Sequence, residues 1–140
     1  MAGILVPVDG SENSMRALKT AVKQINPGSD TKILLLNVQP DVPTAVQRYL
    51  SEDFIKTYYD EESKRTLAAA ITLLHEKRIP YLSYTRVGQA AEAIAAFATE
   101  MQCDQIVMGT RGVGTISRLL LGSVANKVLS LVDIPVTLVK

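Results

Sequence analysis

The chain has 140 residues, a formal net charge of +1 and 47% hydrophobic residues, with no Trp and a single cysteine. This length suits one domain with its own core, and an aliphatic core without Trp favours an α/β fold over a sandwich. The near-zero, interspersed charge excludes a whole-domain attraction to nucleic acid or to an anionic membrane. A lone Cys103 excludes an intramolecular disulfide and a thiolate metal cluster, and it is typical of a reducing compartment, so we expect a cytoplasmic protein.

The first part of the chain predicts two buried strands joined by a helix. Residues 3–8 (GILVPV) and 32–38 (KILLLNV) are largely apolar runs, as in strands that are covered on both faces. The first run is therefore expected to be a strand and not a secretory leader. Between the two runs, Ser11 or Ser14 would cap a helix of regular apolar spacing, and an Asn-Pro-Gly sequence would end it.

The middle of the chain predicts a loop, a long helix and an edge strand. Residues 39–50 contain two prolines and no sustained period, so we expect a loop with room for one short helical turn. Helical spacing follows from about Ser51 to Lys77. The strand at 81–87 (YLSYTRV) alternates in polarity, which suggests a sheet edge.

The last part of the chain completes an alternating order of strands and helices. Gly88 begins a crossover helix, and a strand spans 105–109. A glycine-rich loop then leads to a helix from about Gly122, and VTLV at 136–139 is the final strand. The sequence thus predicts one domain, residues 1–140, with an open parallel sheet of five strands and helices on both faces. Ligands of such sheets bind beyond the carboxyl ends of the strands, where the strand order reverses.

The loop after the fourth predicted strand carries glycines in the pattern G-x2-G-x9-G-[ST], from Gly109 through Gly112 to Gly122 and Ser123. It is neither a Walker A loop nor a Rossmann G-x-G-x-x-G motif. Glycines let the backbone approach an anion, and the start of a helix presents unpaired N–H groups, so the pattern suits phosphate binding. Arg111 lies in the same loop. The alternative is a loop whose glycines only permit a tight turn.

Two further residues at strand ends could contact a nucleotide. Asp9 follows the first strand in the sequence PVDGS, where its carboxylate could accept hydrogen bonds from a ribose or an adenine edge, or hold Mg2+ indirectly. Equally, it could only stabilise the start of the next helix. Val38, at the end of the second strand, could form a wall for a flat base or simply belong to the core.

PVDGS at the first strand and GTRG-x9-GS after the fourth together resemble the universal stress protein family. The final VANKVL and VTLV segments resemble the family's last helix and strand, so the resemblance spans the chain. It implies an adenine nucleotide alpha hydrolase-like sheet of order 3-2-1-4-5. It also implies binding of ATP or another adenine nucleotide, with or without Mg2+, because family members that keep this glycine pattern bind ATP.

The resemblance also implies which residues contact the nucleotide. Pro7, Val8 and Asp9 would meet adenine and ribose, and Val38 would form a wall of the base site. The ribose and the first phosphates would be lined by Met108, Gly109, Arg111 and Gly112. The outer phosphates would be held by Gly122, Ser123 and Val124.

The sequence offers little catalytic machinery. His75 is the only histidine and is predicted in the long helix, away from the strand ends. There is no G-x-S-x-G elbow and no His/Cys cluster for zinc. We therefore expect an ATP-binding regulatory protein of the stress response, in which hydrolysis is slow, partner-dependent or absent. The alternatives are a weak ATPase or autophosphorylating phosphotransferase, and a nucleotide-free dimeric interaction module.

The final strand would lie at a sheet edge in the implied order, with no interior charge to discourage pairing. A two-fold mate could cover it by antiparallel pairing, with Val136 and Leu138 in the contact, and the resemblance implies a homodimer of this kind. An unidentified regulatory protein is a further expected partner, whereas nucleic acid binding is not expected. Membrane insertion is not expected either, since the apolar stretches fall short of the roughly 20 residues of a membrane span.

Overall fold

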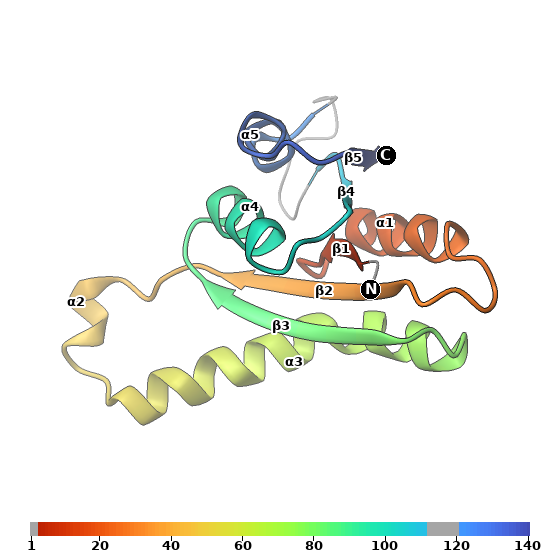
Figure 1. Cartoon of the computed structure of the whole chain (residues 1–140). Coiled ribbons are helices and arrows are strands. Elements are labelled where there is room, and N and C mark those ends of the chain that lie inside the picture. The colour runs from red at the N-terminus through yellow and green to blue at the C-terminus, as the bar shows by residue number, and fades with distance from the viewer. Residues whose placement is uncertain (1–2, 112–120) are drawn as a thin grey trace.

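The computed structural model describes residues 3–111 and 121–140 and is built on a five-stranded parallel sheet (Figure 1). The strand order is β3-β2-β1-β4-β5, and the order reverses between β1 and β4. All four neighbouring pairs are parallel. The predicted α/β fold and strand order are confirmed, as is the edge position of β3. The strands are β1 (Gly3–Pro7), β2 (Lys32–Gln39), β3 (Tyr81–Val87), β4 (Gln105–Gly109) and β5 (Val136–Val139).

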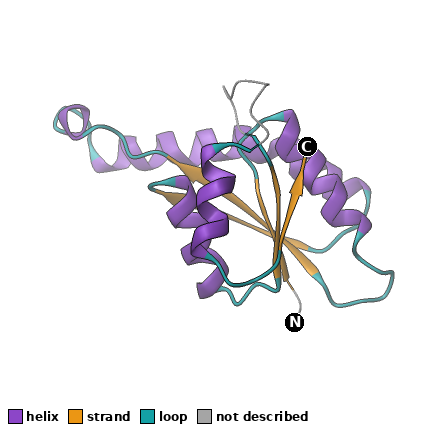
Figure 2. Ribbon diagram, turned by 90° about the horizontal axis from the view of Figure 1, so that it is seen from above, coloured by secondary structure: helices purple, strands orange, loops and turns teal. Residues whose placement is uncertain are grey.

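Helices cover both faces of this sheet (Figure 2). They are α1 (Glu12–Lys23), α2 (Thr44–Gln47), α3 (Glu52–Glu76), α4 (Ala90–Glu100) and α5 (Ser123–Leu131). Side chains of α1 and α3 form one core layer with alternate residues of the central strands, and side chains of α4 and α5 form the other. Neighbouring residues of β1, such as Leu5 and Val6, therefore enter opposite layers, which is why this strand is a continuous apolar run. Among the described residues, no helix is long and apolar enough to cross a membrane.

The turn from β1 into α1 is built by local hydrogen bonds. Ser11 is the N-cap of α1, and its hydroxyl accepts from the Ser14 backbone N–H at 3.1 Å. The Asp9 carboxylate accepts from the Ser11 N–H at 2.9 Å. Gly10 adopts a left-handed φ of 86°, which favours glycine in this turn. The start of α1 is thereby held close to the carboxyl end of β1.

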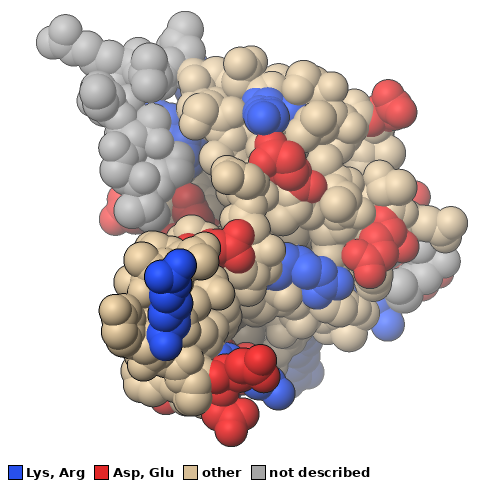
Figure 3. All heavy atoms as spheres, turned by 90° about the vertical axis from the view of Figure 1, so that its left-hand side faces the viewer, with Lys and Arg blue, Asp and Glu red and all other residues tan. Residues whose placement is uncertain are grey.

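The segment after β2 and the first turns of α3 project beyond the sheet (Figure 1). The predicted loop at 39–50 contains the short helix α2, and the Tyr59 hydroxyl of α3 accepts from the Val42 N–H at 2.8 Å. The first buried residue of α3 is Ser63. Figure 3 looks onto this projecting end, where acidic and basic side chains are scattered among uncharged ones. The core therefore begins only half-way along α3.

Candidate functional site

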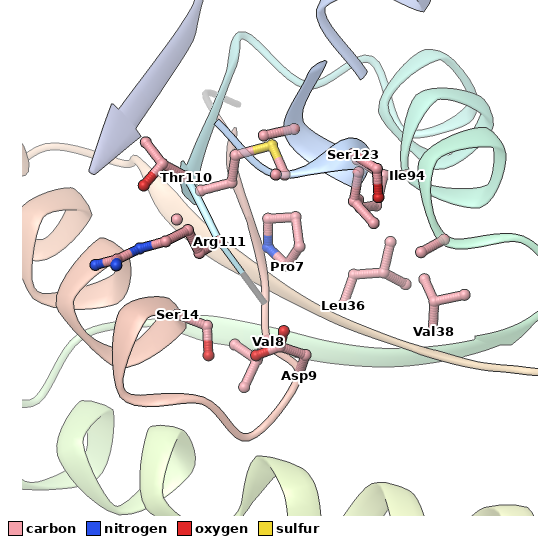
Figure 4. Close-up of a pocket in the computed structure, with 16 residues that line it drawn as sticks. Pro7, Val8, Asp9, Ser14, Leu36, Val38, Ile94, Thr110, Arg111 and Ser123 are labelled. Atoms are coloured by element: carbon pink, nitrogen blue, oxygen red, sulfur yellow. The ribbon is translucent and has the colours of Figure 1, made fainter. Parts of the chain in front are cut away.

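A cleft of about 330 Å³ opens at the carboxyl ends of β1 and β4, where the strand order reverses (Figure 4). This volume lies within the range of small-molecule sites. Every predicted contact residue within the described ranges lines it, although these residues come from distant parts of the chain. They are Pro7, Val8, Asp9, Val38, Met108, Gly109, Arg111, Gly122, Ser123 and Val124. The remaining predicted residue, Gly112, lies outside the described residues.

Several residues that line the cleft were not predicted. They are Ser14, Leu36, Ala90, Ile94, Thr110 and Ala125. Two of them carried a readable signal: Ala90 and Ile94 are four positions apart at the start of the helix that follows Gly88, so they lie on one helical face. Leu36 is two positions before Val38 on β2, so both side chains point to the same face of the sheet.

One end of the cleft is apolar. Leu36 and Val38 lie beside Ile94 in Figure 4, and Pro7 lies between them and α1. The end of β1 is braced from β2, because the Asn37 side-chain amide donates to the Val8 carbonyl at 2.9 Å. This end of the cleft offers apolar side chains and the main chain of two strand ends, a combination that suits an aromatic base.

The glycine-rich side of the cleft is shaped by contacts within the protein. Neither Gly109 nor Gly122 has a positive φ, so a left-handed turn is not the reason for either glycine. A Cβ atom at position 109 would overlap the Asn13 side chain of α1. A Cβ atom at position 122 would lie 3.0 Å from the Thr110 carbonyl oxygen, which also accepts a hydrogen bond from the Gly122 N–H. The two ends of the glycine loop are thus held together at its base.

Helix α5 begins at this closed base, with Gly122 as its N-cap residue, in agreement with the predicted start. This glycine has no side chain with which to cap the helix. Its first N–H groups and the Ser123 hydroxyl stand at the cleft, so they can serve an anionic group. Ser123 lies opposite Asp9 and Ser14 in Figure 4, and Arg111 extends toward α1. The apolar end of the cleft and the end formed by the start of α5 are therefore built by different elements.

Among the described residues, few charged groups lie near the cleft. Lys127 of α5 forms an ion pair with Glu92 of α4, with 3.0 Å between the ammonium and the carboxylate, and so joins two helices that line the cleft. His75 lies elsewhere, with its Nε2 atom 2.9 Å from the Tyr81 hydroxyl. In the part of the chain that the structure describes, no three His, Cys, Asp or Glu side chains are grouped so as to hold a metal ion.

Residues 2–140 match the model of the universal stress protein family. The chain belongs to this family. A universal stress protein of Thermus aquaticus is 32% identical, with 98% of this chain and 97% of the relative aligned. The universal stress protein MJ0531 of Methanocaldococcus jannaschii is also 32% identical, over 98% of this chain and 81% of the relative. The solved structure of the protein MJ0577 superposes with a TM-score of 0.85 at 29% identity, covering 99% of this chain and 95% of that one.

Structures of other members of the fold contain adenine nucleotides. A universal stress protein family protein of Arabidopsis thaliana was solved with AMP (21% identity, TM-score 0.70; 100% of this chain and 92% of that chain covered). The universal stress protein of Archaeoglobus fulgidus was solved with dAMP (21% identity, TM-score 0.73; 100% and 98% covered). A further universal stress protein was solved with cAMP (23% identity, TM-score 0.69; 99% and 97% covered). These three similarities concern the fold.

Proposed function

We propose that this universal stress protein binds an adenine nucleotide in the cleft, with ATP as the expected ligand, and acts as a nucleotide-dependent regulatory protein of the stress response. One observation carries the proposal: a single cleft at the switch point unites all the described residues that the family pattern assigns to the nucleotide. Homologues with this fold bind AMP, dAMP and cAMP, which share the adenosine part.

The apolar end of the cleft suits the base. A purine site needs an apolar lining and a few polar groups near the edge of the base. Leu36, Val38 and Ile94 supply the apolar lining, and the strands β1 and β2 end beside them. The Asp9 carboxylate stands between this end and α1, within the part of the cleft that a ribose would occupy.

The start of α5 suits the phosphates. The N–H groups of its first turn and the Ser123 hydroxyl supply donors, and the positive end of the helix dipole favours an anion. Mg2+ in such sites is held mainly by phosphate oxygens and one or two carboxylates. Among the described residues that line the cleft, Asp9 is the only acidic one, so it would serve that ion directly or through water.

We infer that binding, and not rapid turnover, is the activity of this site. The Asp9 carboxylate already accepts a hydrogen bond from the Ser11 N–H in the turn into α1. It lies at the end of β1, whereas the phosphate donors lie at the start of α5. A carboxylate in that place orients the ligand and stabilises the turn better than it activates water at an outer phosphate.

Calorimetric titration of the purified protein with ATP, AMP and adenosine, at constant Mg2+, tests the proposal. ATP and AMP should bind, and Val38→Asn should weaken both by about tenfold or more, because it places a polar amide against the base. Val46→Asn is the matched control, since Val46 is 44% exposed and lies on α2, away from the cleft. Ser123→Ala should weaken ATP more than adenosine.

Two results would overturn the proposal. If millimolar ATP and AMP neither release heat nor raise the melting temperature, the cleft does not bind a nucleotide, because a ligand specific for the native state must stabilise it. If the purified protein releases ADP at more than about 1 per second, within the usual range of enzymes, the site is catalytic and the regulatory proposal fails.

A further inference from the structure

Asn13 is a buried polar residue that connects three parts of the molecule. It lies in the first turn of α1 and its side chain is only 6% exposed. Its Nδ2 atom donates to the Val139 carbonyl at 2.8 Å, and its Oδ1 atom accepts from the Arg111 backbone N–H at 2.8 Å. One carboxamide thus joins α1, the second residue after β4 at the cleft and the last residue of β5.

The end of β5 is held by further bonds from the same two directions. The Thr110 N–H donates to the Val139 carbonyl at 3.0 Å, so this oxygen accepts both from the residue that follows β4 and from α1. Arg16, one helical turn after Asn13, donates through Nε to the Lys140 carbonyl at 2.8 Å. The last two residues of the chain are therefore attached to the helix that starts beside Asp9 and to the strand that ends at the cleft.

The chemistry at position 13 requires an amide in one orientation. A main-chain N–H faces one end of the side chain and a main-chain carbonyl faces the other, so the side chain needs an acceptor and a donor at fixed places. Gly109 makes room for it, because a Cβ at that position would overlap the Asn13 Oδ1 atom. Asn13 and Gly109 are thus a matched pair, and this accounts for one of the motif glycines without a ligand.

We propose that Asn13 is a positioning residue that couples occupancy of the cleft to the edge strand β5. The inference rests on the proposed nucleotide binding and names how that site reaches the rest of the molecule. Asp9 and Arg111 both line the cleft. The Asp9 carboxylate is bonded to the turn that leads into α1, the helix that carries Asn13, and the Arg111 N–H is bonded to Asn13 itself. A ligand that contacts Asp9 and Arg111 therefore acts on Asn13 from both sides. Asn13 is also bonded to Val139, so the ligand restrains β5 as well. Because such coupling is reciprocal, a partner that pairs with β5 in turn changes the affinity for the ligand.

Asn13→Asp separates the two halves of the network. The carboxylate still accepts from the Arg111 N–H, but it has no donor for the Val139 carbonyl. Amide hydrogen exchange of β5, measured by mass spectrometry with and without saturating ATP, is the readout. In the wild-type protein ATP should slow exchange in β5 by about fivefold or more, a common size of coupling. In Asn13→Asp that protection should be lost, while ATP affinity stays within about threefold of wild type.

The matched control is Asn26→Asp, the same chemical change at an exposed position beyond the far end of α1. It should keep the full protection of β5. If Asn13→Asp binds ATP and still shows wild-type protection of β5, Asn13 has only a structural role and the proposal is overturned. If the wild-type protein does not bind ATP, both this inference and the proposed function fail. ATP binding by the wild type therefore shows which of the two has failed.

A second experiment needs no ligand. Gly109→Ala and Asn13→Ala should each lower the melting temperature by about 4 °C or more. In Gly109→Ala the new methyl group overlaps the Asn13 side chain, and Asn13→Ala removes the side-chain acceptor of the Arg111 N–H. The double variant should melt no lower than Asn13→Ala alone, because the side chain that overlaps the new methyl group is gone. Additive losses would show that the two positions are not coupled and would overturn the network.

Discussion

Cys103 is the residue whose ionisation the fold changes most clearly. Its side chain lies in the core layer of α4 and α5, and burial, together with the nearby Asp104 carboxylate, raises the pKa of the thiol to about 11. Because only the thiolate reacts, native Cys103 should react with iodoacetamide at pH 8 about a hundredfold more slowly than the unfolded chain. Comparing the rates in buffer and in urea checks this. Equal rates would show that the native thiol is accessible and ionises normally.

The same shift has a consequence for stability. An acid whose pKa is raised by folding contributes stability below its unfolded pKa, and that contribution is lost as the thiol of the unfolded chain ionises. The loss therefore begins near the ordinary thiol pKa of 9.0 and is complete near pH 11. Cys103→Ser removes this dependence. The free energies of unfolding of wild type and variant, measured by urea titration between pH 8 and 11, should therefore converge as the pH rises.

Gly109 shows why single residues are harder to interpret than patterns. Its place in the glycine motif predicts a close approach of the backbone to an anion. The structure adds a close approach to the Asn13 side chain, which is 96 positions earlier in the chain. No periodicity or local propensity connects the two, because the contact exists only once α1 packs beside β4. Asp9 was open to two interpretations for the same reason, and its carboxylate in fact bonds the turn into α1 while it lines the cleft.

At the scale of elements, α3 consists of two different halves. Phe54 and Tyr58 in the first half are 58% and 46% exposed, whereas Leu67 in the second half is 4% exposed. Apolar spacing predicts the whole helix correctly. It does not tell which half packs on the sheet, since that depends on where the sheet ends.

The two halves should respond differently to truncation. Leu67→Ala should reduce the free energy of unfolding by about 2–5 kcal/mol, because it leaves a cavity beneath the sheet. Tyr58→Ala should change it by less than about 1 kcal/mol, because nearly half of that residue is exposed to water. Urea denaturation followed by circular dichroism measures both values. A large loss for Tyr58→Ala would mean that the first turns of α3 are covered in solution by another surface.

At the scale of the whole molecule, the strand order leaves β3 and β5 at the two edges of the sheet. The continuous apolar runs predicted the central strands, and the alternating run predicted the edge position of β3. The position of β5 came from the family pattern, because its four residues are too few to distinguish an edge from a centre. In the structure Val136 and Leu138 are half-buried against the α4 and α5 layer. Their side chains thus support the strand from one face, and its outer backbone groups are the part that a second chain could pair with.

Antiparallel pairing of two β5 strands can be tested through one amide. The carbonyls of Pro135 and Val139 accept from Ile106 of β4 and from Thr110 just after it. The alternation of a parallel ladder therefore turns the Leu138 N–H away from β4, toward the open edge. Leu138→Pro removes this outward donor and leaves every bond to β4 in place, whereas Leu138→Ala loses the same core contacts but keeps the donor. If the protein is the dimer that the family pattern implies, light scattering after size exclusion should give a dimer mass for wild type and Leu138→Ala and a monomer mass for Leu138→Pro. A dimer that survives the proline must use another surface, because a proline ring at that position blocks both the hydrogen bond and the close approach of a neighbouring strand.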